Sequence, residues 1–193
     1  MKVYQAYKDS GIQWIGEIPN HWNVRKLFQV ADSYYESNKG LKNQNLLSLS
    51  HGSIIQKDIN KTDGLLPASF ETYQIVQPSI IVLRLTDLQN DHKSLRVGIS
   101  EYEGIVTSAY EALKVREPNN AKYVYYQLHA NDIHKVFYGM GNGLRQNLNY
   151  DGMRYMLLVM PSPAEQEAIV DFLETKTLKI DGYKRERERV TAA

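Results

Sequence analysis

The chain has 193 residues and a formal net charge of +1, enough for one domain with a core and an appended element. The near-neutral charge excludes a protein that holds nucleic acid mainly through a blanket of positive charge. The absence of cysteine excludes disulfides, thiolate nucleophiles and cysteine zinc sites. Because no apolar segment suits a signal peptide or a membrane span, we expect a cytoplasmic protein with no membrane partner.

The first half of the chain predicts short strands separated by polar loops. Gly11, Gly16 and Pro19 exclude one continuous helix over residues 8–22. The pattern over residues 24–35 is compatible with a helix or a strand. Further along, apolar runs predict two strands within 45–56 and single strands at 73–76, 80–85, 96–100 and 104–108.

The second half predicts two helices and a last strand. Apolar residues at steps of three and four predict an amphipathic helix from Ala121 to Tyr138, which the following glycines end. Residues 155–160 predict the strand. Ser162, Pro163 and Glu165 then supply a capping serine, a proline at the first helical position and a glutamate three after the cap. They predict a helix over 163–190, about 28 residues and roughly 42 Å long.

This C-terminal helix carries a thin apolar stripe on an otherwise charged surface. Such a stripe on so long a helix suits a second helix better than a globular core. The alternative is a helix folded back on its own domain. For pairing with a second copy, we expect the interface to contain Ile169, Phe172, Leu173, Lys176, Ile180, Tyr183 and Val190.

The residue patterns favour no catalytic site. No GxxxxGK[ST] loop is present for nucleotide hydrolysis. The turn Phe137–Gly141 resembles a methyltransferase FxGxG turn but follows a predicted helix instead of a strand. Asp87, Asp91 and His92 lack a third metal ligand by spacing. We therefore expect no catalytic residue and no metal site.

Polar loops on a sheet-rich scaffold are the remaining candidates for function. Arginine reads guanine with two hydrogen bonds, and asparagine or glutamine reads adenine in the same way. The glycine-rich segment 141–147 combines these side chains with glycines that allow a close backbone approach. The candidate DNA-contacting residues, in three loops, are Lys39, Lys42, Asn43, Asn90, His92, Lys93, Arg96, Asn142, Arg145, Gln146 and Asn147.

Two segments at opposite ends of the chain resemble one protein family. DSGIQWIGEIPNHW (9–22) resembles the opening of specificity subunits of type I restriction–modification enzymes and of their target-recognition domains. MPSPAEQEAIVDFLETKTLKID (160–181) resembles the start of the conserved helix that follows each recognition domain. IIVLRLTD, GIVTSAY and GLRQNL fall between them where the family carries similar short motifs.

The resemblance implies a division of labour between subunits. Family members carry two recognition domains, each reading one half of an interrupted DNA target, held apart by two antiparallel conserved helices. Modification subunits supply S-adenosylmethionine and methyl transfer, and a restriction subunit supplies ATP-driven translocation and cleavage. We expect this chain to hold no cofactor and to leave S-adenosylmethionine, ATP and magnesium to those partners. One recognition domain and part of one helix are present, as in a natural half-subunit, a split product or a truncation.

Together, these observations predict an α+β fold with a sheet-rich target-recognition domain over 1–161 and a conserved helix for dimerisation and spacing over 162–193. The predicted function is sequence-specific recognition of double-stranded DNA by a homodimer, without catalysis. One alternative is the recognition domain of a fused type II restriction–methyltransferase. Another is an interaction module that binds modification subunits without reading DNA.

Overall fold

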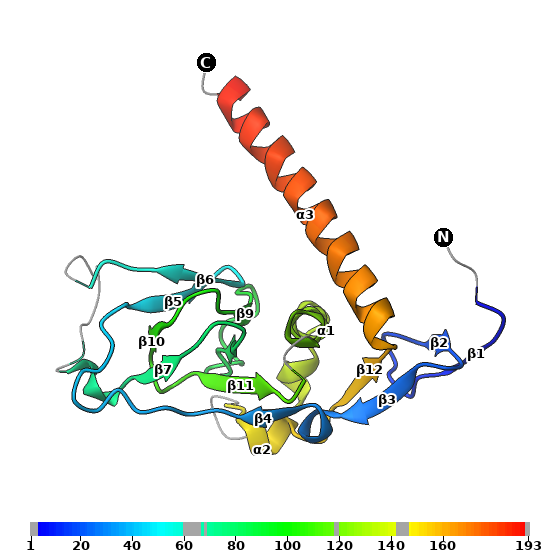
Figure 1. The fold of residues 1–193 in the computed structure, drawn as a ribbon, viewed down its shortest axis with the longest axis horizontal. Helices are drawn as coiled ribbons and strands as arrows, with labels where there is room; N and C mark the ends of the chain where they lie inside the picture. Colours follow the sequence, from blue (N-terminus) through cyan, green and yellow to red (C-terminus); the bar gives the residue numbers. More distant parts are fainter. Residues whose placement is uncertain (1–3, 60–66, 68, 118–119, 142–146, 192–193) are drawn as a thin grey trace.

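The computed structural model describes residues 4–59, 67, 69–117, 120–141 and 147–191, with side chains of the last helix described through residue 180 and at Tyr183. A sheet-rich body carries one long helix that rises away from it (Figure 1). The predicted α+β class is confirmed. The strands are β1 Tyr7–Asp9, β2 Glu17–Pro19, β3 Asn23–Lys26, β4 Ala31–Ser33, β5 Leu47–Ser50, β6 Ser53–Gln56, β7 Gln74–Val76, β8 Ile81–Leu83, β9 Val97–Ile99, β10 Gly104–Val106, β11 Glu111–Val115 and β12 Leu157–Met160. The helices are α1 Ala121–Ile133, α2 Tyr150–Met153 and α3 Pro163–Thr191, with 3-10 turns at Leu27–Gln29, Phe70–Thr72 and Val136–Gly139.

The centre of the body is an antiparallel sheet in the order β4-β11-β8-β9. All three residues of β8 are buried, as expected for a continuous apolar run in an inner strand of a sheet covered on both faces. Leu83 and Leu113 belong to the main core, which α1 completes with Val124 and Leu128. The predicted strand over 80–85 is thus confirmed as β8, three residues shorter.

A second layer is built from two antiparallel pairs, β10-β7 and β5-β6. The segment before β5 crosses β10 closely, where the Ile105 backbone N–H donates to the Asn45 carbonyl at 2.8 Å. A Cβ on Gly104 would lie 2.4 Å from that oxygen, so glycine is needed for the close approach. The predicted strands at 45–56, 73–76 and 104–108 therefore form this layer.

The segment that the sequence left undecided forms two strands with a single 3-10 turn between them. Residues 23–26 are β3, which pairs with β12, and residues 31–33 are β4, which pairs with β11. The chain thereby links the central sheet to the β3-β12 pair at the base of α3 (Figure 1).

Helix α1 ends earlier than predicted. The helix was expected to reach Tyr138, but it stops at Ile133, and Lys135 adopts a left-handed conformation with φ of 59°. A 3-10 turn over Val136–Gly139 then buries Phe137 in the main core. The apolar spacing continued beyond the helix because this turn also packs inward, which periodicity alone does not distinguish from a helix.

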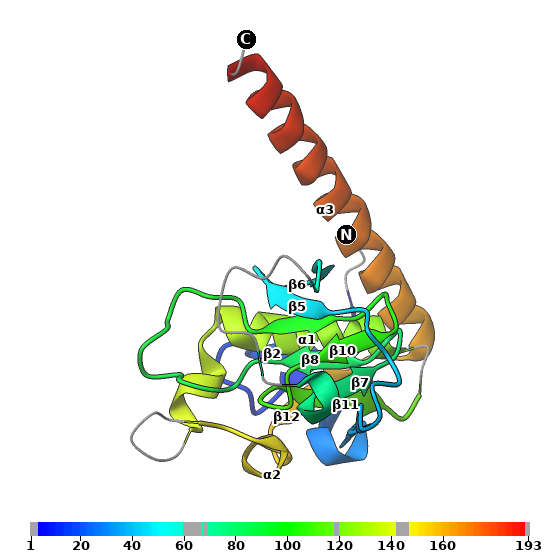
Figure 2. The same cartoon turned by 90° about the vertical axis from the view of Figure 1, so that its left-hand side faces the viewer.

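Helix α3 extends over Pro163–Thr191, in agreement with the predicted 163–190. The Glu165 carboxylate accepts hydrogen bonds from the Ser162 backbone N–H at 3.1 Å and from Ser162 Oγ at 2.7 Å. This satisfies the start of the helix as the capping pattern predicts. The first turns pack on α1 and the body, and the rest of α3 extends beyond it in both views (Figures 1 and 2).

Candidate functional site

The loop between β8 and β9 contains four of the candidate DNA-contacting residues. Its stem continues the strand ladder, because the Arg84 N–H donates to the Arg96 carbonyl at 2.9 Å. At its tip, Asn90, His92 and Lys93 are exposed to solvent. Three polar side chains at the tip of a loop on a sheet are suitable contacts for bases and phosphates.

The prediction that Arg96 contacts DNA is wrong. Its side chain is completely buried inside the loop, at 0% exposure. The guanidinium donates to backbone carbonyls of the loop and to the Tyr138 hydroxyl, so it has no free edge for a base or a phosphate. The sequence analysis placed Arg96 among the exposed cations of the loop. Most of its hydrogen-bond partners are backbone carbonyls, and a residue pattern does not reveal such partners.

The same loop contains a carboxylate that is paired with a cation. Asp91 forms an ion pair with Arg84 and accepts hydrogen bonds from the backbone N–H groups of Lys93 and Ser94. Hydrogen bonds from Ser94, together with the N–H of Lys93 and the charge of Arg84, lower the pKa of Asp91 despite its partial burial. Asp91 therefore remains ionised and paired with Arg84.

Tyr138 connects this loop to the segment after α1. Its ring stacks on His92, with centroids 4.8 Å apart and planes inclined by 23°. Its hydroxyl donates to the Asp91 carbonyl at 2.9 Å. The ammonium of Lys135 lies 5.0 Å from the ring centroid. Tyr138 was not among the predicted site residues, although a tyrosine just after a helix and next to glycines is a usable signal.

The far side of the glycine-rich segment is also attached to this loop. The Asp87 backbone N–H donates to Asn147 Oδ1 at 2.8 Å, and the Leu148 N–H donates to the Leu85 carbonyl at 2.9 Å. Asn147 is exposed, but its side-chain oxygen is thus already in use. Asn142, Arg145 and Gln146 lie outside the described residues. The structure therefore brings the β8–β9 loop together with both flanks of the 142–146 segment, which lie on one side of the body (Figure 2).

The third predicted loop, with Lys39, Lys42 and Asn43, has different neighbours. The buried side chain of Asn38 holds it through hydrogen bonds with the backbone of Asn43 and Phe70. Asn43 Nδ2 donates to Glu103 Oε1 at 3.0 Å. Lys39 and Lys42 are exposed, whereas Asn43 is half-buried and engaged with a carboxylate. Its two lysines remain candidates for phosphate contacts, and Asn43 is the weakest candidate of the loop.

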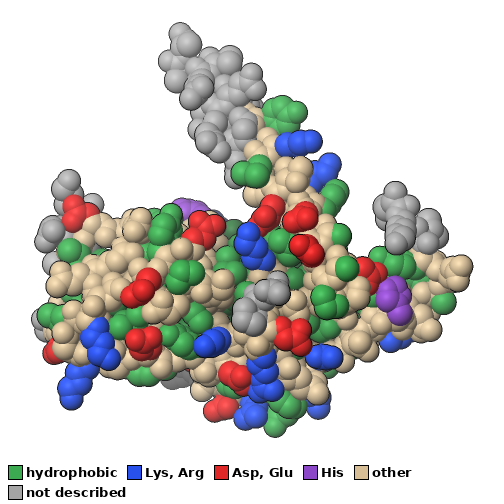
Figure 3. Space-filling view, viewed as in Figure 1, with side chains coloured by type: hydrophobic (Ala, Val, Ile, Leu, Met, Phe, Trp, Pro, Cys, Tyr) green, Lys and Arg blue, Asp and Glu red, His purple; other side chains and the backbone are tan. Residues whose placement is uncertain are grey.

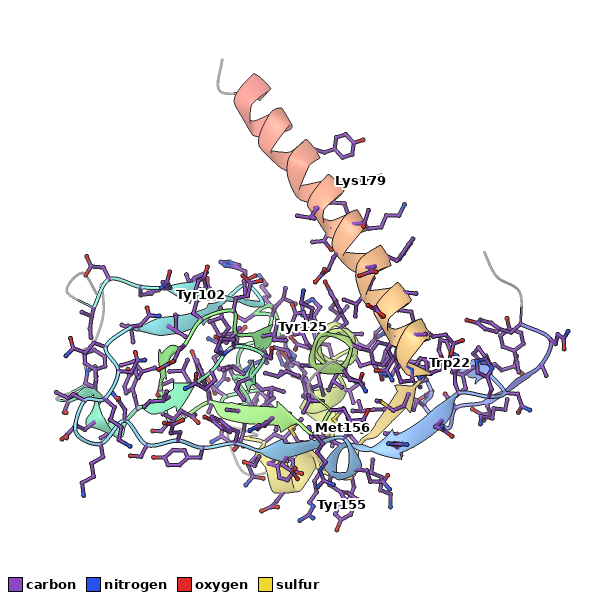
Figure 4. The ribbon with its side chains drawn as sticks, viewed as in Figure 1. Trp22, Tyr102, Tyr125, Tyr155, Met156 and Lys179 are labelled. Carbon is purple, nitrogen blue, oxygen red and sulfur yellow. The ribbon has the colours of Figure 1, made fainter. Side chains whose placement is uncertain are left out.

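The stripe of α3 is divided between the body and solvent. Ile169 and Leu173 are half-buried and line an apolar cleft of about 250 Å³ with Trp14 and Trp22 from the N-terminal segment. Figure 4 shows Trp22 at the base of α3. These two stripe residues therefore pack on the body of their own chain and not on a second copy.

The remaining described stripe residues are open to solvent. Phe172 is 60% exposed, Ile180 53% and Tyr183 71%. Lys176 is exposed too, with its ammonium 5.4 Å from the centroid of the Phe172 ring. The side chain of Val190 lies outside the described ones. Apolar side chains are visible along the projecting helix (Figure 3), and the high exposure of Phe172, Ile180 and Tyr183 leaves the stripe available to a partner.

Two further features concern metal ions and the membrane. Among the described residues, no group of three or more histidine, aspartate or glutamate side chains is arranged to hold a metal ion. Within the same part of the chain, no helix has the length and apolar character needed to cross a membrane.

Comparison with known proteins identifies similar folds only among solved structures. No known protein family and no curated protein matches the sequence. The HsdS subunit from Thermoanaerobacter tengcongensis superposes with a TM-score of 0.57 and 12% identity, over 93% of this chain and 42% of that one. A chain from a structure described as the basis of complex assembly and conformational transition of the type I R-M system superposes with a TM-score of 0.60 and 13% identity. The match covers 96% of this chain and 45% of that one. The type I restriction-modification system S subunit from M. genitalium superposes with a TM-score of 0.54 and 13% identity, over 84% of this chain and 40% of that one.

The three solved structures agree on the architecture. The chain spans less than half the length of each of them. At identities of 12–13% the likeness establishes the fold, and it does so over nearly the whole of this chain. The resemblance that the two terminal motifs indicated is therefore confirmed as the fold of part of a type I specificity subunit.

Proposed function

We propose that this chain recognises a DNA sequence as one half of a type I specificity subunit and has no catalytic activity of its own. The observation that carries the proposal is the joined pair of polar segments, the β8–β9 loop and the flanks of 142–146. They lie on a body whose fold is that of solved type I specificity subunits. Body and helix have separate tasks: residues 1–161 read DNA, and the helix from residue 162 sets the distance to a second reader.

The exposed face of α3 favours pairing with a second copy of this chain. A face with three exposed large apolar residues, Phe172, Ile180 and Tyr183, is costly to leave in water. Two copies joined by this face present two identical bodies to one duplex, related by a twofold axis. The expected target is an inverted repeat with a fixed gap.

The chemistry belongs to other subunits in this proposal. Modification subunits bring S-adenosylmethionine, and a restriction subunit brings ATP and magnesium. Those partners also supply positive surface, because a chain with a net charge of +1 neutralises few phosphates alone. We therefore expect DNA affinity to increase when modification subunits are added.

A selection from randomised duplex DNA tests the proposal. The full chain is incubated with a randomised pool, with and without modification subunits, and the bound fraction is separated by electrophoresis and sequenced. An enriched two-part motif supports sequence-specific recognition. A bound fraction with no enriched motif, from a chain that still captures modification subunits, favours the interaction module instead.

A further inference from the structure

Arg96 sits at the centre of the β8–β9 loop and uses its whole hydrogen-bonding capacity there. A guanidinium has five N–H donors in a fixed planar fork. Each of the five has an acceptor within the molecule. The acceptors are the carbonyl oxygens of Arg84 (3.0 Å), Thr86 (2.9 Å), Asp87 (3.4 Å) and Asp91 (2.5 Å) and the hydroxyl of Tyr138 (3.0 Å).

The loop is folded around this group. Beyond the ladder bond between Arg84 and Arg96, few strand contacts define the path of residues 86–94. Leu88 anchors the loop in the main core, and the guanidinium donates hydrogen bonds to four carbonyls of the loop. Because the guanidinium is planar and rigid, it specifies the relative positions of the carbonyls that it binds.

Arg96 is itself held from below by α1. Its backbone N–H donates to Asp132 Oδ2 at 2.5 Å, and Asp132 is fully buried in the last turns of the helix. The loop is thus bonded to α1, and Tyr138 lies in the 3-10 turn that follows this helix. A displacement of Arg96 would be transmitted to both polar segments.

Tyr138 extends the arrangement from the backbone to an exposed side chain. Its hydroxyl accepts from Arg96 Nε and donates to the Asp91 carbonyl, while its ring stacks on His92. Arg96 therefore holds the Asp91 carbonyl directly, and through Tyr138 it contributes to the position of the His92 ring, which is also held by a 2.9 Å hydrogen bond with the Gln89 carbonyl.

We propose that Arg96 is a positioning residue for base reading, acting with Tyr138 to hold the tip of the β8–β9 loop in one conformation. The inference rests on the proposed function. It adds that discrimination between sequences depends on a buried arginine that touches no DNA. Electrostatic attraction to phosphates does not depend on it, because the exposed Lys93 of the loop carries that attraction.

Two variants and one control test this role. Arg96→Lys keeps the charge but supplies three donors from a single point in place of five in a fork. Tyr138→Phe removes only the hydroxyl and keeps the ring that faces His92. Arg116→Lys is the matched control, because Arg116 makes a comparable two-point contact with Asp32 at the exposed edge of the central sheet.

Each variant is measured in three ways. Thermal unfolding gives the folded fraction, and amide hydrogen exchange without DNA reports on the Lys93 and Ser94 N–H groups, which bond to Asp91. Randomised-pool selection and titration with the enriched and a scrambled duplex give the specificity ratio. We expect that ratio to fall about tenfold for Arg96→Lys, as for loss of one base contact. We expect a smaller fall for Tyr138→Phe, faster exchange at both amides, unchanged scrambled-duplex affinity and no effect in the control.

The outcomes separate this inference from the proposed function. A folded Arg96→Lys protein that is less stable but enriches the unchanged motif with the same ratio overturns the positioning role and leaves DNA recognition intact. If Arg96→Lys does not fold, Tyr138→Phe decides, and an unchanged ratio there overturns the role. If the unaltered chain enriches no motif, DNA recognition fails at that first step, and the positioning role fails with it.

Discussion

The indole Nε1 of Trp22 donates a 3.2 Å hydrogen bond to the carboxylate of Glu165, joining the N-terminal segment to the first turn of α3. The same carboxylate oxygen is bonded by Tyr4 Oη at 3.1 Å and His21 Nε2 at 2.9 Å. Its other oxygen is bonded by Ser162. One side chain therefore ties the N-terminal segment to the first turn of α3 and adds to the packing of this helix on α1.

Replacing Glu165 by alanine should lower the free energy of unfolding by about 1–2 kcal/mol, through loss of the cap and of several hydrogen bonds to a charged group. Urea unfolding of the full chain measures the change. Glu167→Ala is the matched control, because Glu167 is exposed in the same first turns. Equal losses in the two variants would contradict the role given to Glu165.

The stabilisation by Glu165 should depend on pH. Burial alone would raise the pKa of Glu165, but hydrogen bonds from Ser162, His21 and Trp22 overcome that effect and lower the pKa from 4.5 to about 2. A pKa that is lower in the folded state means that the stabilisation is complete above pH 4.5 and is lost as the pH falls toward 2. The stability difference between the unaltered chain and Glu165→Gln should therefore be constant from pH 5 to 7 and shrink below it. A difference that stays constant down to pH 3 would argue against this.

The exposed stripe predicts the effect of charge on self-association. Ile180→Lys places an ammonium in the proposed helix interface, and we expect it to shift sedimentation at tens of micromolar from dimer to monomer. Leu178→Lys is the matched control. Leu178 is 68% exposed, and it lies about 2.5 turns from Ile169 and hence on the opposite side of α3.

The two helix variants should behave differently. Loss of the dimer in Ile180→Lys but not in Leu178→Lys supports the stripe as the interface. A chain that sediments as a monomer before any substitution is made would contradict pairing through α3.

Lys93 should contribute attraction to DNA without contributing specificity. It is exposed at the loop tip, so Lys93→Ala should weaken binding to enriched and scrambled duplexes alike and reduce the slope of log affinity against log salt by about one. Lys179→Ala removes the same charge from α3, far from the loop (Figure 4), and should leave the slope unchanged. A loss restricted to the enriched duplex would identify Lys93 as a base contact instead.

The elements best predicted from the sequence are those with local signals. Ser162, Pro163 and Glu165 located the start of α3 because a helix cap is built from neighbouring residues. Residues 80–85 predicted the central strand because a continuous apolar run needs burial on both faces. The end of α1 was missed, since the left-handed turn at Lys135 is not encoded by apolar spacing.

The candidate site was predicted less well, because its contacts are distant in the sequence. The loop was located correctly as a polar segment. Its arginine, Arg96, was predicted to contact DNA but is buried in the interior of the loop. The side chain is buried because carbonyls from residues 84 to 91 and the hydroxyl of Tyr138 converge on it. Likewise, Ile169 and Leu173 follow the stripe of α3 but pack against Trp14 and Trp22, a contact that helical periodicity alone does not specify.

The most direct test of the account is to map DNA on the protein by amide hydrogen exchange, with the duplex enriched by selection and with a scrambled duplex. We predict that the enriched duplex slows exchange in residues 87–95 and 134–141 more than the scrambled one does, with no change on the Leu178 side of α3. Slowed exchange confined to α3, or equal effects of the two duplexes on the body, would contradict the claim that these joined polar segments read the sequence.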